Sequence, residues 1–249
     1  MQNPESQWFG RKPVTPQEKT HMVLGVFDSV ASRYDLMNDL MSLGIHRLWK
    51  DTLIRKIHPT ASLRYLDVAG GTGDIAFRIA AATGHKANIT VSDINANMLD
   101  VGKSRAIDKG YLDQFQWVEG NAEHLPFKDN SFDVYTISFG LRNVTHIDEA
   151  LKDAYRLLRP GGRFFCLEFS HLDNAQLQKA YDLYSYTVIP KMGRYVTGDE
   201  DSYQYLVESI RAFPKRDDLT QRLKKAGFDE AKSTPLSFGL VAIHEAWKY

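Results

Sequence analysis

The sequence predicts a doubly wound α/β fold, in which helices cover both faces of a mostly parallel, seven-stranded sheet. From Leu63 onward, short apolar or β-branched runs alternate with longer segments whose apolar residues have helical spacing, the pattern of a parallel sheet with crossover helices. A glycine-rich segment, Gly70–Gly73, directly follows the first of these runs, as at a tight strand-to-helix turn. The length of 249 residues, with 43% hydrophobic and 25% charged residues, suits one folded domain.

Each strand is expected from a short apolar or β-branched run bounded by turn-forming residues. The expected strands are Leu63–Val68, Asn88–Ser92, Phe115–Val118, Phe132–Ser138, Arg163–Phe169, Ala231–Thr234 and Leu240–Trp247. The first five are each followed by a turn and a helix-compatible segment, such as Asp148–Leu158. The segment Arg159–Gly162 ends that helix and turns the chain into the fifth strand, because proline and glycine stop helices. A helix over Asp217–Ala226, closed by Gly227, precedes the last two strands.

Two regions outside the alternating pattern complete the single domain, which we expect over residues 21–249. Residues 1–20 are polar and contain three prolines, which predicts a flexible arm. Residues 21–60 form a helical cap, since Gln17–Val30 and His46–Ile57 have helical spacing of apolar positions. Residues 171–213 carry six of the 12 tyrosines and interrupt the alternation, which predicts an insertion that acts as a substrate lid.

Composition and charge exclude several classes of protein. Lys plus Arg and Asp plus Glu number 31 each, so no overall charge favours binding to nucleic acid. The single cysteine, Cys166, rules out a disulfide framework and a cysteine-based metal site, and we expect no metal. No apolar stretch approaches the roughly 20 residues that span a bilayer. These features predict a cytoplasmic protein, in contact with the inner membrane face at most peripherally.

The segment after the first strand has the residues of a cofactor-binding turn. It reads Leu66-Asp67-Val68-Ala69-Gly70-Gly71-Thr72-Gly73-Asp74 and precedes a helix that we expect from about Ile75. Glycines such as Gly71 and Gly73 allow the backbone to approach a ligand closely. Asp93 stands 20 residues after Gly73 at the end of the second strand, where a carboxylate can bind both hydroxyls of an adenosine ribose. The sequence therefore predicts an adenosine-containing cofactor.

Two cofactor classes fit this spacing, because Gly71-x-Gly73-x-x-Ala76 also satisfies the dinucleotide pattern. Asp74 in the first helical turn and Asp67 behind the loop would repel a pyrophosphate. The sulfonium and α-ammonium groups of S-adenosylmethionine are cationic and complement an acidic loop. S-adenosylmethionine is therefore the favoured cofactor, and an NAD-dependent oxidoreductase is the alternative.

Two further strand ends lie where open α/β sheets bind ligands. Gly120-Asn121-Ala122-Glu123 follows the third strand, and Asn121 would face the adenine of a cofactor, although asparagine in a turn explains this position equally well. The fourth strand ends at Ser138, which we expect close to the cofactor.

Four longer segments resemble the ubiquinone/menaquinone biosynthesis C-methyltransferase (UbiE) family of class I S-adenosylmethionine-dependent methyltransferases, which have a Rossmann-like sheet. The segments are Phe27–Asp39, Ser42–Lys50, Ile137–Thr145 and Asp201–Ile210, and the resemblance extends over about residues 20–249. It implies cofactor contacts at Thr72, Asp93, Asn121, Ala122 and Ser138.

The resemblance implies transfer of a methyl group to a ring carbon of a polyprenylated benzoquinol, a demethylmenaquinol or both. The ring must first lose a hydroxyl proton, so the site needs a base or a group that stabilises a phenolate. Arg142 and Asn143 are the candidates for stabilisation, since arginine stays protonated and pairs well with an anionic oxygen. Tyr34, next to Asp35 on the cap, would close over the ring, although helix packing explains these two residues nearly as well. His46 and His124 are candidate bases, but an ordinary surface position is the more frequent explanation for a histidine.

The prenyl tail of such an acceptor needs an apolar channel or a membrane-facing patch. The aromatic-rich stretch Leu177–Tyr205 is the candidate, with simple packing of the insertion as an equal alternative. The expected partners are the polyprenylated quinol, the membrane surface or a quinone-biosynthesis complex, and a second copy in a homodimer. A different lipophilic acceptor, such as a sterol or a phenol, stays open as an alternative substrate.

Overall fold

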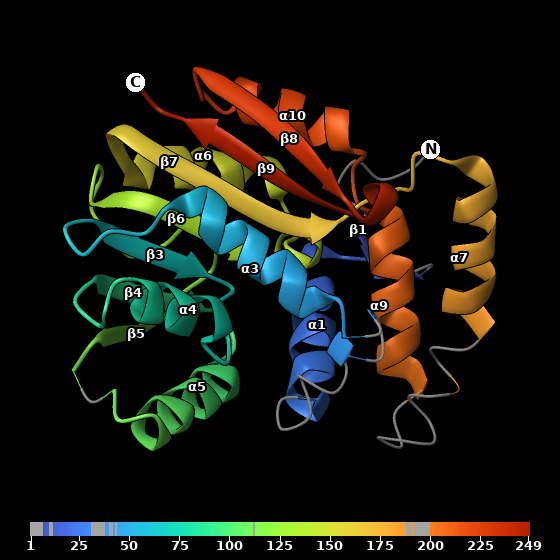
Figure 1. Cartoon of the computed structure of the whole chain (residues 1–249). Coiled ribbons are helices and arrows are strands. Elements are labelled where there is room, and N and C mark those ends of the chain that lie inside the picture. The colour runs from blue at the N-terminus through green and yellow to red at the C-terminus, as the bar shows by residue number, and fades with distance from the viewer. Residues whose placement is uncertain are drawn as a thin grey trace.

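The computed structural model describes residues 7–9, 12–30, 38–39, 42, 44–111, 113–187, 191 and 200–249. The strands of its main sheet are β3 (Arg64–Val68), β4 (Asn88–Asp93), β5 (Phe115–Glu119), β6 (Phe132–Ser138), β7 (Leu158–Phe169), β8 (Glu230–Leu236) and β9 (Val241–Trp247). The order is β5-β4-β3-β6-β7-β9-β8, and all strands are parallel except β9, which runs antiparallel to both neighbours (Figure 1). This arrangement confirms the predicted fold class.

Helices cover both faces of the sheet, because successive side chains of each strand point to opposite faces and both faces are apolar. Phe165 of β7 faces one core and its neighbour Phe164 faces the other. The helices of the first core are α1 (Pro16–Val30), α3 (His46–Ile57), α4 (Asp74–Ala82), α5 (Ala96–Asp108) and α9 (Glu200–Ala212), and those of the second are α6 (Ile147–Leu157) and α10 (Arg216–Lys225). Figure 1 shows α3, α4 and α5 in front of the sheet and α6 behind it.

Part of the stretch predicted as a flexible arm forms regular structure. Strands β1 (Gln7–Phe9) and β2 (Lys12–Val14) form an antiparallel hairpin, and the ring of Phe9 stacks on Tyr205 of α9 at 4.1 Å between centroids. The first helix begins at Pro16, where Thr15 and Glu18 exchange backbone-to-side-chain hydrogen bonds of 2.7 and 3.2 Å. This capping box can be recognised in the sequence. It starts the helix at Pro16, within the stretch that the three prolines had indicated as a flexible arm.

Two connections also differ from the expectation. No helix follows β5, since residues 120–131 reach β6 through turns and an isolated bridge. The segment Arg159–Gly162 lies within β7 rather than before it, and the register against β6 shifts across it. Gly161 has a φ of +82°, so it permits an irregularity in the strand where a helix stop was expected.

The stretch predicted as an insertion, residues 171–213, contains α7 (Ala175–Thr187) and α9. Tyr203 and Tyr205 of α9 are buried in the first core, which matches the packing alternative for these two tyrosines. Helix α7 lies outside α9 in Figure 1. Tyr195 lies outside the described residues. Within the described ranges, no helix is long and apolar enough to span a bilayer.

Candidate functional site

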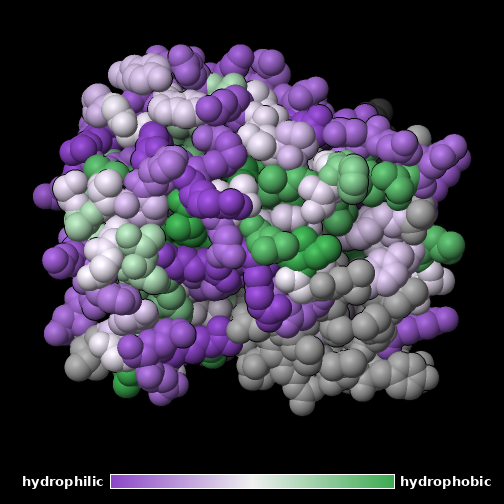
Figure 2. All heavy atoms as spheres, in the orientation of Figure 1, coloured by the Kyte–Doolittle hydropathy of each residue, from purple (hydrophilic) through white to green (hydrophobic). Residues whose placement is uncertain are grey.

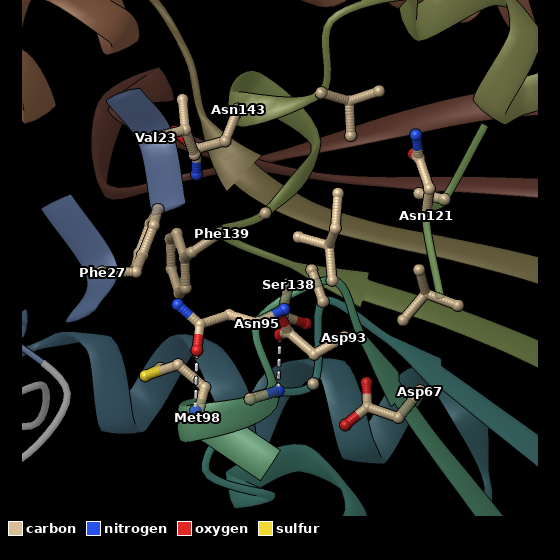
Figure 3. A pocket seen from close by; sticks show the side chains of 18 of the residues that line it. Val23, Phe27, Asp67, Asp93, Asn95, Met98, Asn121, Ser138, Phe139 and Asn143 are labelled. Atoms are coloured by element: carbon tan, nitrogen blue, oxygen red, sulfur yellow. Dashed lines mark hydrogen bonds between the residues drawn. The ribbon is translucent and has the colours of Figure 1, made fainter. Parts of the chain in front are cut away.

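A cleft opens at the carboxyl ends of β3, β4 and β6, beside the point where the strand order reverses. Its space measures about 1060 Å³ including the open mouth. Polar groups line one side, and α1 contributes apolar side chains to the other. Figure 3 shows Val23 and Phe27 of α1 across the cleft from Asp67. The cleft is therefore polar toward the sheet and apolar toward the helical cap.

The glycine loop between β3 and α4 forms the floor of this cleft. Gly71 lines it with a φ of +47°, and the buried Thr72 lies beside it. Gly73 has a φ of +82° and does not line the cleft. A Cβ atom on Gly73 would lie 2.8 Å from the ring of Phe77, so this glycine serves the turn and the packing of α4.

Asp93 ends β4 and presents a buried carboxylate to the cleft. Its Oδ2 accepts a hydrogen bond from the backbone N–H of Gly71 at 2.9 Å (Figure 3), and its Oδ1 accepts one from that of Asn95, also at 2.9 Å. Burial raises the pKa of Asp93 to about 6, although these backbone donors oppose the shift. Each carboxylate oxygen keeps a second lone pair, so the two oxygens can accept further hydrogen bonds from two neighbouring hydroxyl groups of a ligand.

Asp67 is a second buried carboxyl group of the cleft. Thr136 donates to its Oδ1 at 2.7 Å, whereas Oδ2 is buried with no hydrogen-bond partner among the described residues. Burial raises the pKa of Asp67 to about 7. A buried carboxylate oxygen without a partner is costly unless a ligand supplies a donor or a cation.

The electrostatic role expected of Asp74 needs correction. Burial acts to raise the pKa of Asp74, but Lys50 and Arg78 lower it below its ordinary value. Lys50 Nζ lies 2.6 Å from Asp74 Oδ2, and Arg78 Nε lies 2.9 Å from Oδ1. Asp74 is therefore neutralised, and the acidic groups of the cleft are Asp67 and Asp93.

The predicted adenine and strand-end residues also line the cleft. Asn121 Oδ1 accepts a hydrogen bond from the backbone of Glu123 at 3.0 Å, as in the turn explanation, and Ala122 is buried beside it. Ser138 Oγ is buried and has no hydrogen-bond partner within the described part of the chain. It is thus a further polar atom that a ligand can satisfy.

The turn after Ser138 brings β6 into close contact with the glycine loop. Phe139 has a left-handed φ of 56°, and a Cβ atom on Gly140 would lie 2.4 Å from Cβ of Ala69. This turn carries Asn143 into the cleft, where its Oδ1 accepts a hydrogen bond from Tyr205 Oη at 3.1 Å. Figure 3 shows the amide nitrogen of Asn143 pointing toward Phe139, which makes it a donor inside the cleft.

The side chain of Arg142 does not line the cleft. Its guanidinium is buried, lies 3.0 Å from Glu168 (Nη1 to Oε1) and donates to the backbone oxygen of Phe139. Arg142 lines a separate groove and not the cleft. Glu168 balances its charge, and these contacts hold the turn after β6, while the expected role of Arg142 toward a phenolate stays a prediction.

Neither of the two predicted histidine bases lines the cleft. His46 is buried, its Nε2 lies 2.9 Å from Asp39 Oδ1, and it does not line the cleft. His124 is exposed and outside the lining as well. Tyr34 and Asp35 lie outside the described residues. Among the described side chains, no group of three or more His, Cys, Asp and Glu could hold a metal ion.

The sequence analysis missed several residues that line the cleft, among them Lys50 and Asn95. Lys50 has a buried side chain on α3, and only the packing of α3 against α4 brings it to the cleft. Asn95 accepts a hydrogen bond from the backbone of Met98 at 3.0 Å and caps α5, and its amide donates to Asp28 of α1 at 2.8 Å. The capping role of Asn95 was readable from an asparagine directly before a helix.

Comparison with known proteins places these features in one family. The model of the ubiE/COQ5 methyltransferase family matches residues 15–248. A ubiquinone/menaquinone biosynthesis C-methyltransferase UbiE of Brucella abortus is 54% identical over 242 residues, which cover 96% of this chain and 90% of the relative. The UbiE protein of Brucella anthropi is also 54% identical, over 96% of this chain and 92% of its own.

Solved structures share the fold at low sequence identity. A Thermotoga maritima structure described as a SAM-dependent methyltransferase, possible histamine N-methyltransferase, has a TM-score of 0.65 and 20% identity over 91% of this chain and all of its own. A SAM-dependent methyltransferase from Aquifex aeolicus has a TM-score of 0.57 and 12% identity over 79% of this chain and 88% of its own. At these identities, the likeness shows the fold alone.

Proposed function

The chain belongs to the ubiE/COQ5 methyltransferase family, and from this premise we propose how its cleft carries out C-methylation in ubiquinone/menaquinone biosynthesis. The protein is an S-adenosylmethionine-dependent C-methyltransferase. Its acceptor is a polyprenylated benzoquinol, a demethylmenaquinol or both. The single observation that carries the site assignment is the pair of buried carboxyl groups, Asp67 and Asp93, that line the cleft beside the glycine loop.

The charges of the cleft match the methionine end of the cofactor. Asp67 lines the cleft as a buried acid that forms no ion pair with a basic side chain among the described residues, so it would bind the α-ammonium, whereas Lys50 is already paired with Asp74. Asp93 would accept hydrogen bonds from the ribose hydroxyls. Thr72, Asn121 and the backbone of Ala122 would contact the remaining polar atoms of the nucleoside. When bound, S-adenosylmethionine supplies an electrophilic methyl group.

At the acceptor, we assign the stabilising role to Asn143 in place of Arg142. The hydrogen bond from Tyr205 fixes the amide oxygen of Asn143 and leaves its N–H groups as donors toward the cleft. A preorganised donor stabilises negative charge that develops on a ring oxygen as the ring carbon becomes nucleophilic. Val23, Phe27 and Phe139 would exclude water from the ring.

Incubation with methyl-labelled S-adenosylmethionine tests this function. The acceptors are short-tailed forms of the reduced benzoquinol and demethylmenaquinol precursors, and mass spectrometry locates the label. We expect label on a ring carbon and loss of cofactor binding in Asp93→Ala. Asn143→Ala should lower kcat at least tenfold with unchanged cofactor affinity. Cofactor binding without label on either acceptor would refute the quinol assignment.

A further inference from the structure

Two segments that are far apart in the chain meet beside the cleft. One is residues 9–20, which include the end of β1, strand β2 and the start of α1, and we call it the N-terminal segment. The other is residues 141–145, a short 3₁₀ helix and the two residues after it, and we call it the acceptor turn because it carries Asn143. A single turn of 3₁₀ helix has weak internal hydrogen bonding, so its position depends on contacts with other elements.

Two side chains of α1 bind the acceptor turn directly. Lys19 Nζ donates to the backbone oxygen of Val144 at 3.1 Å. The hydroxyl groups of Thr20 and Thr145 lie 3.3 Å apart and share a hydrogen bond. Both contacts come from the first turns of α1, whose start is fixed by its capping box. The chain that leaves Asn143 is therefore held at two successive residues.

The burial of Lys19 is costly unless its ammonium group has a partner. Lys19 is 8% exposed, and burial lowers its pKa, an effect that the charge of Glu123 opposes. A lysine facing solvent would avoid this penalty. The hydrogen bond to Val144 offsets it, so the contact with the acceptor turn accounts for a buried lysine at this position.

The hairpin reaches Asn143 through Tyr205 of α9. The ring of Phe9 stacks on that of Tyr205 with 4.1 Å between centroids and 10° between planes, and Tyr205 is buried. Figure 1 shows β1 beside α9, and Figure 2 shows hydrophobic side chains on the surface over this place. In this setting the hydroxyl group of Tyr205 donates to Asn143 Oδ1 at 3.1 Å. The stacked rings therefore fix the direction from which the hydroxyl group meets Asn143.

The orientation of the Asn143 amide decides what the cleft offers to an acceptor. With its oxygen bound by Tyr205, the amide presents N–H donors to the cleft (Figure 3). Rotation of the amide by about 180° would present the oxygen instead, which repels a ring oxygen that gains negative charge. The donor is effective only when other residues hold it in place before the reaction.

We propose that the N-terminal segment positions the acceptor turn and, through Phe9 and Tyr205, sets the amide orientation of Asn143 for methyl transfer. This inference rests on the proposed function, because it acts through the role assigned there to Asn143. Phe9, Lys19 and Tyr205 are positioning residues, since none of them lines the cleft. Their loss lowers the rate of methyl transfer and leaves cofactor binding unchanged.

A double-mutant cycle in the full chain tests this positioning. Tyr205→Phe removes the hydroxyl group and keeps the stacked ring. Tyr65→Phe is the matched control, because it removes a buried hydroxyl group that donates to the backbone of Thr60, near the amino end of β3. With a short-tailed quinol, we expect Tyr205→Phe to lower kcat about fivefold or more, with KM and the Kd of S-adenosylhomocysteine within about twofold of wild type. Tyr65→Phe should leave kcat unchanged, and Tyr205→Phe should add nothing to the loss in Asn143→Ala.

Substitutions in the N-terminal segment test its own contribution. Phe9→Leu removes the stacked ring and Phe9→Tyr keeps it, so only the first should lower kcat. Lys19→Met keeps a long, unbranched side chain without the ammonium group and should also lower kcat, by about threefold or more. Its control is Lys103→Met on the exposed face of α5, which should turn over as wild type does.

The side-chain amide signals of Asn143 in NMR spectra give a readout that needs no turnover. In isotope-labelled protein saturated with S-adenosylhomocysteine, Asn143→Ala identifies these signals. Tyr205→Phe and Phe9→Leu should shift them, whereas Tyr65→Phe should not. Unchanged signals in Tyr205→Phe, or losses in kcat that multiply in the double variant with Asn143→Ala, would overturn the positioning. Failure of wild type to methylate any quinol, with the expected shifts of the signals, would refute only the proposed function.

Discussion

Replacing Asp93 with asparagine tests the proposed ribose contact most directly. Each carboxylate oxygen already accepts one backbone N–H at 2.9 Å, from Gly71 and from Asn95. Asparagine keeps one acceptor oxygen, and its NH₂ group must then face one of these N–H donors. The variant therefore loses one ribose hydrogen bond to a charged acceptor and sets two donors against each other.

The expected cost in affinity follows from the lost ribose contact. A hydrogen bond to a charged group contributes about 1.5–3 kcal/mol, or roughly 10- to 150-fold in Kd, whereas the clash of the two donors is present with and without ligand and lowers stability instead. Calorimetric titration with S-adenosylhomocysteine at pH 8, where the Asp93 carboxyl with its pKa of about 6 is ionised, measures the change in Kd. Asp100→Asn, on the exposed face of α5, is the control and should bind as wild type does.

A thermodynamic cycle that combines Asp93→Asn with a ligand lacking the ribose 2′-hydroxyl isolates the contact between Asp93 and this hydroxyl. Wild type should lose affinity for the deoxy ligand, and Asp93→Asn should lose less, because part of the interaction is already absent. A Kd for Asp93→Asn within threefold of wild type, in a protein that still unfolds cooperatively, would refute the ribose assignment.

Three further predictions concern stability. Burial raises the pKa of Asp67 from 3.8 to about 7, so between these pH values the folded protein holds a proton that the unfolded chain has released. The free energy of unfolding without cofactor should therefore fall as pH rises through this window. Asp67→Asn lacks this loss, so in urea unfolding its stability relative to wild type should increase by up to about 4 kcal/mol from pH 4 to pH 8. In Gly140→Ala, the new methyl group would lie 2.4 Å from Cβ of Ala69, and we expect a loss of about 1–3 kcal/mol, seen as a lower Tm; an unchanged Tm would contradict the close approach. Glu168→Gln leaves the buried guanidinium of Arg142 without its counter-charge and should cost about 3–5 kcal/mol in urea unfolding, whereas a loss below 1 kcal/mol would argue against the buried pair.

The sequence alone determined the fold class and the positions of the strand ends. Strands, their apolar runs and the glycine loop are local features, because they depend on side-chain periodicity and on the backbone freedom of a few residues. The carboxyl ends of parallel strands must meet at one edge, so Asp67, Asp93 and Ser138 could be assigned to one cleft without coordinates. The capping box at Thr15 is also a local pattern, but the prolines around it led to the prediction of a flexible arm instead.

The tertiary structure alone decided which charges stay available in the cleft. Asp74 is neutralised by Lys50 from another helix, and Arg142 by Glu168, 26 residues further along the chain. Ion pairs of this kind depend on how helices and strands pack. From the sequence alone, each of these residues has to be counted with its full formal charge. The hydrogen bond from Tyr205 to Asn143 likewise joins residues 62 positions apart. The proposed role of Asn143 at the acceptor therefore depends on a contact that no local sequence pattern encodes.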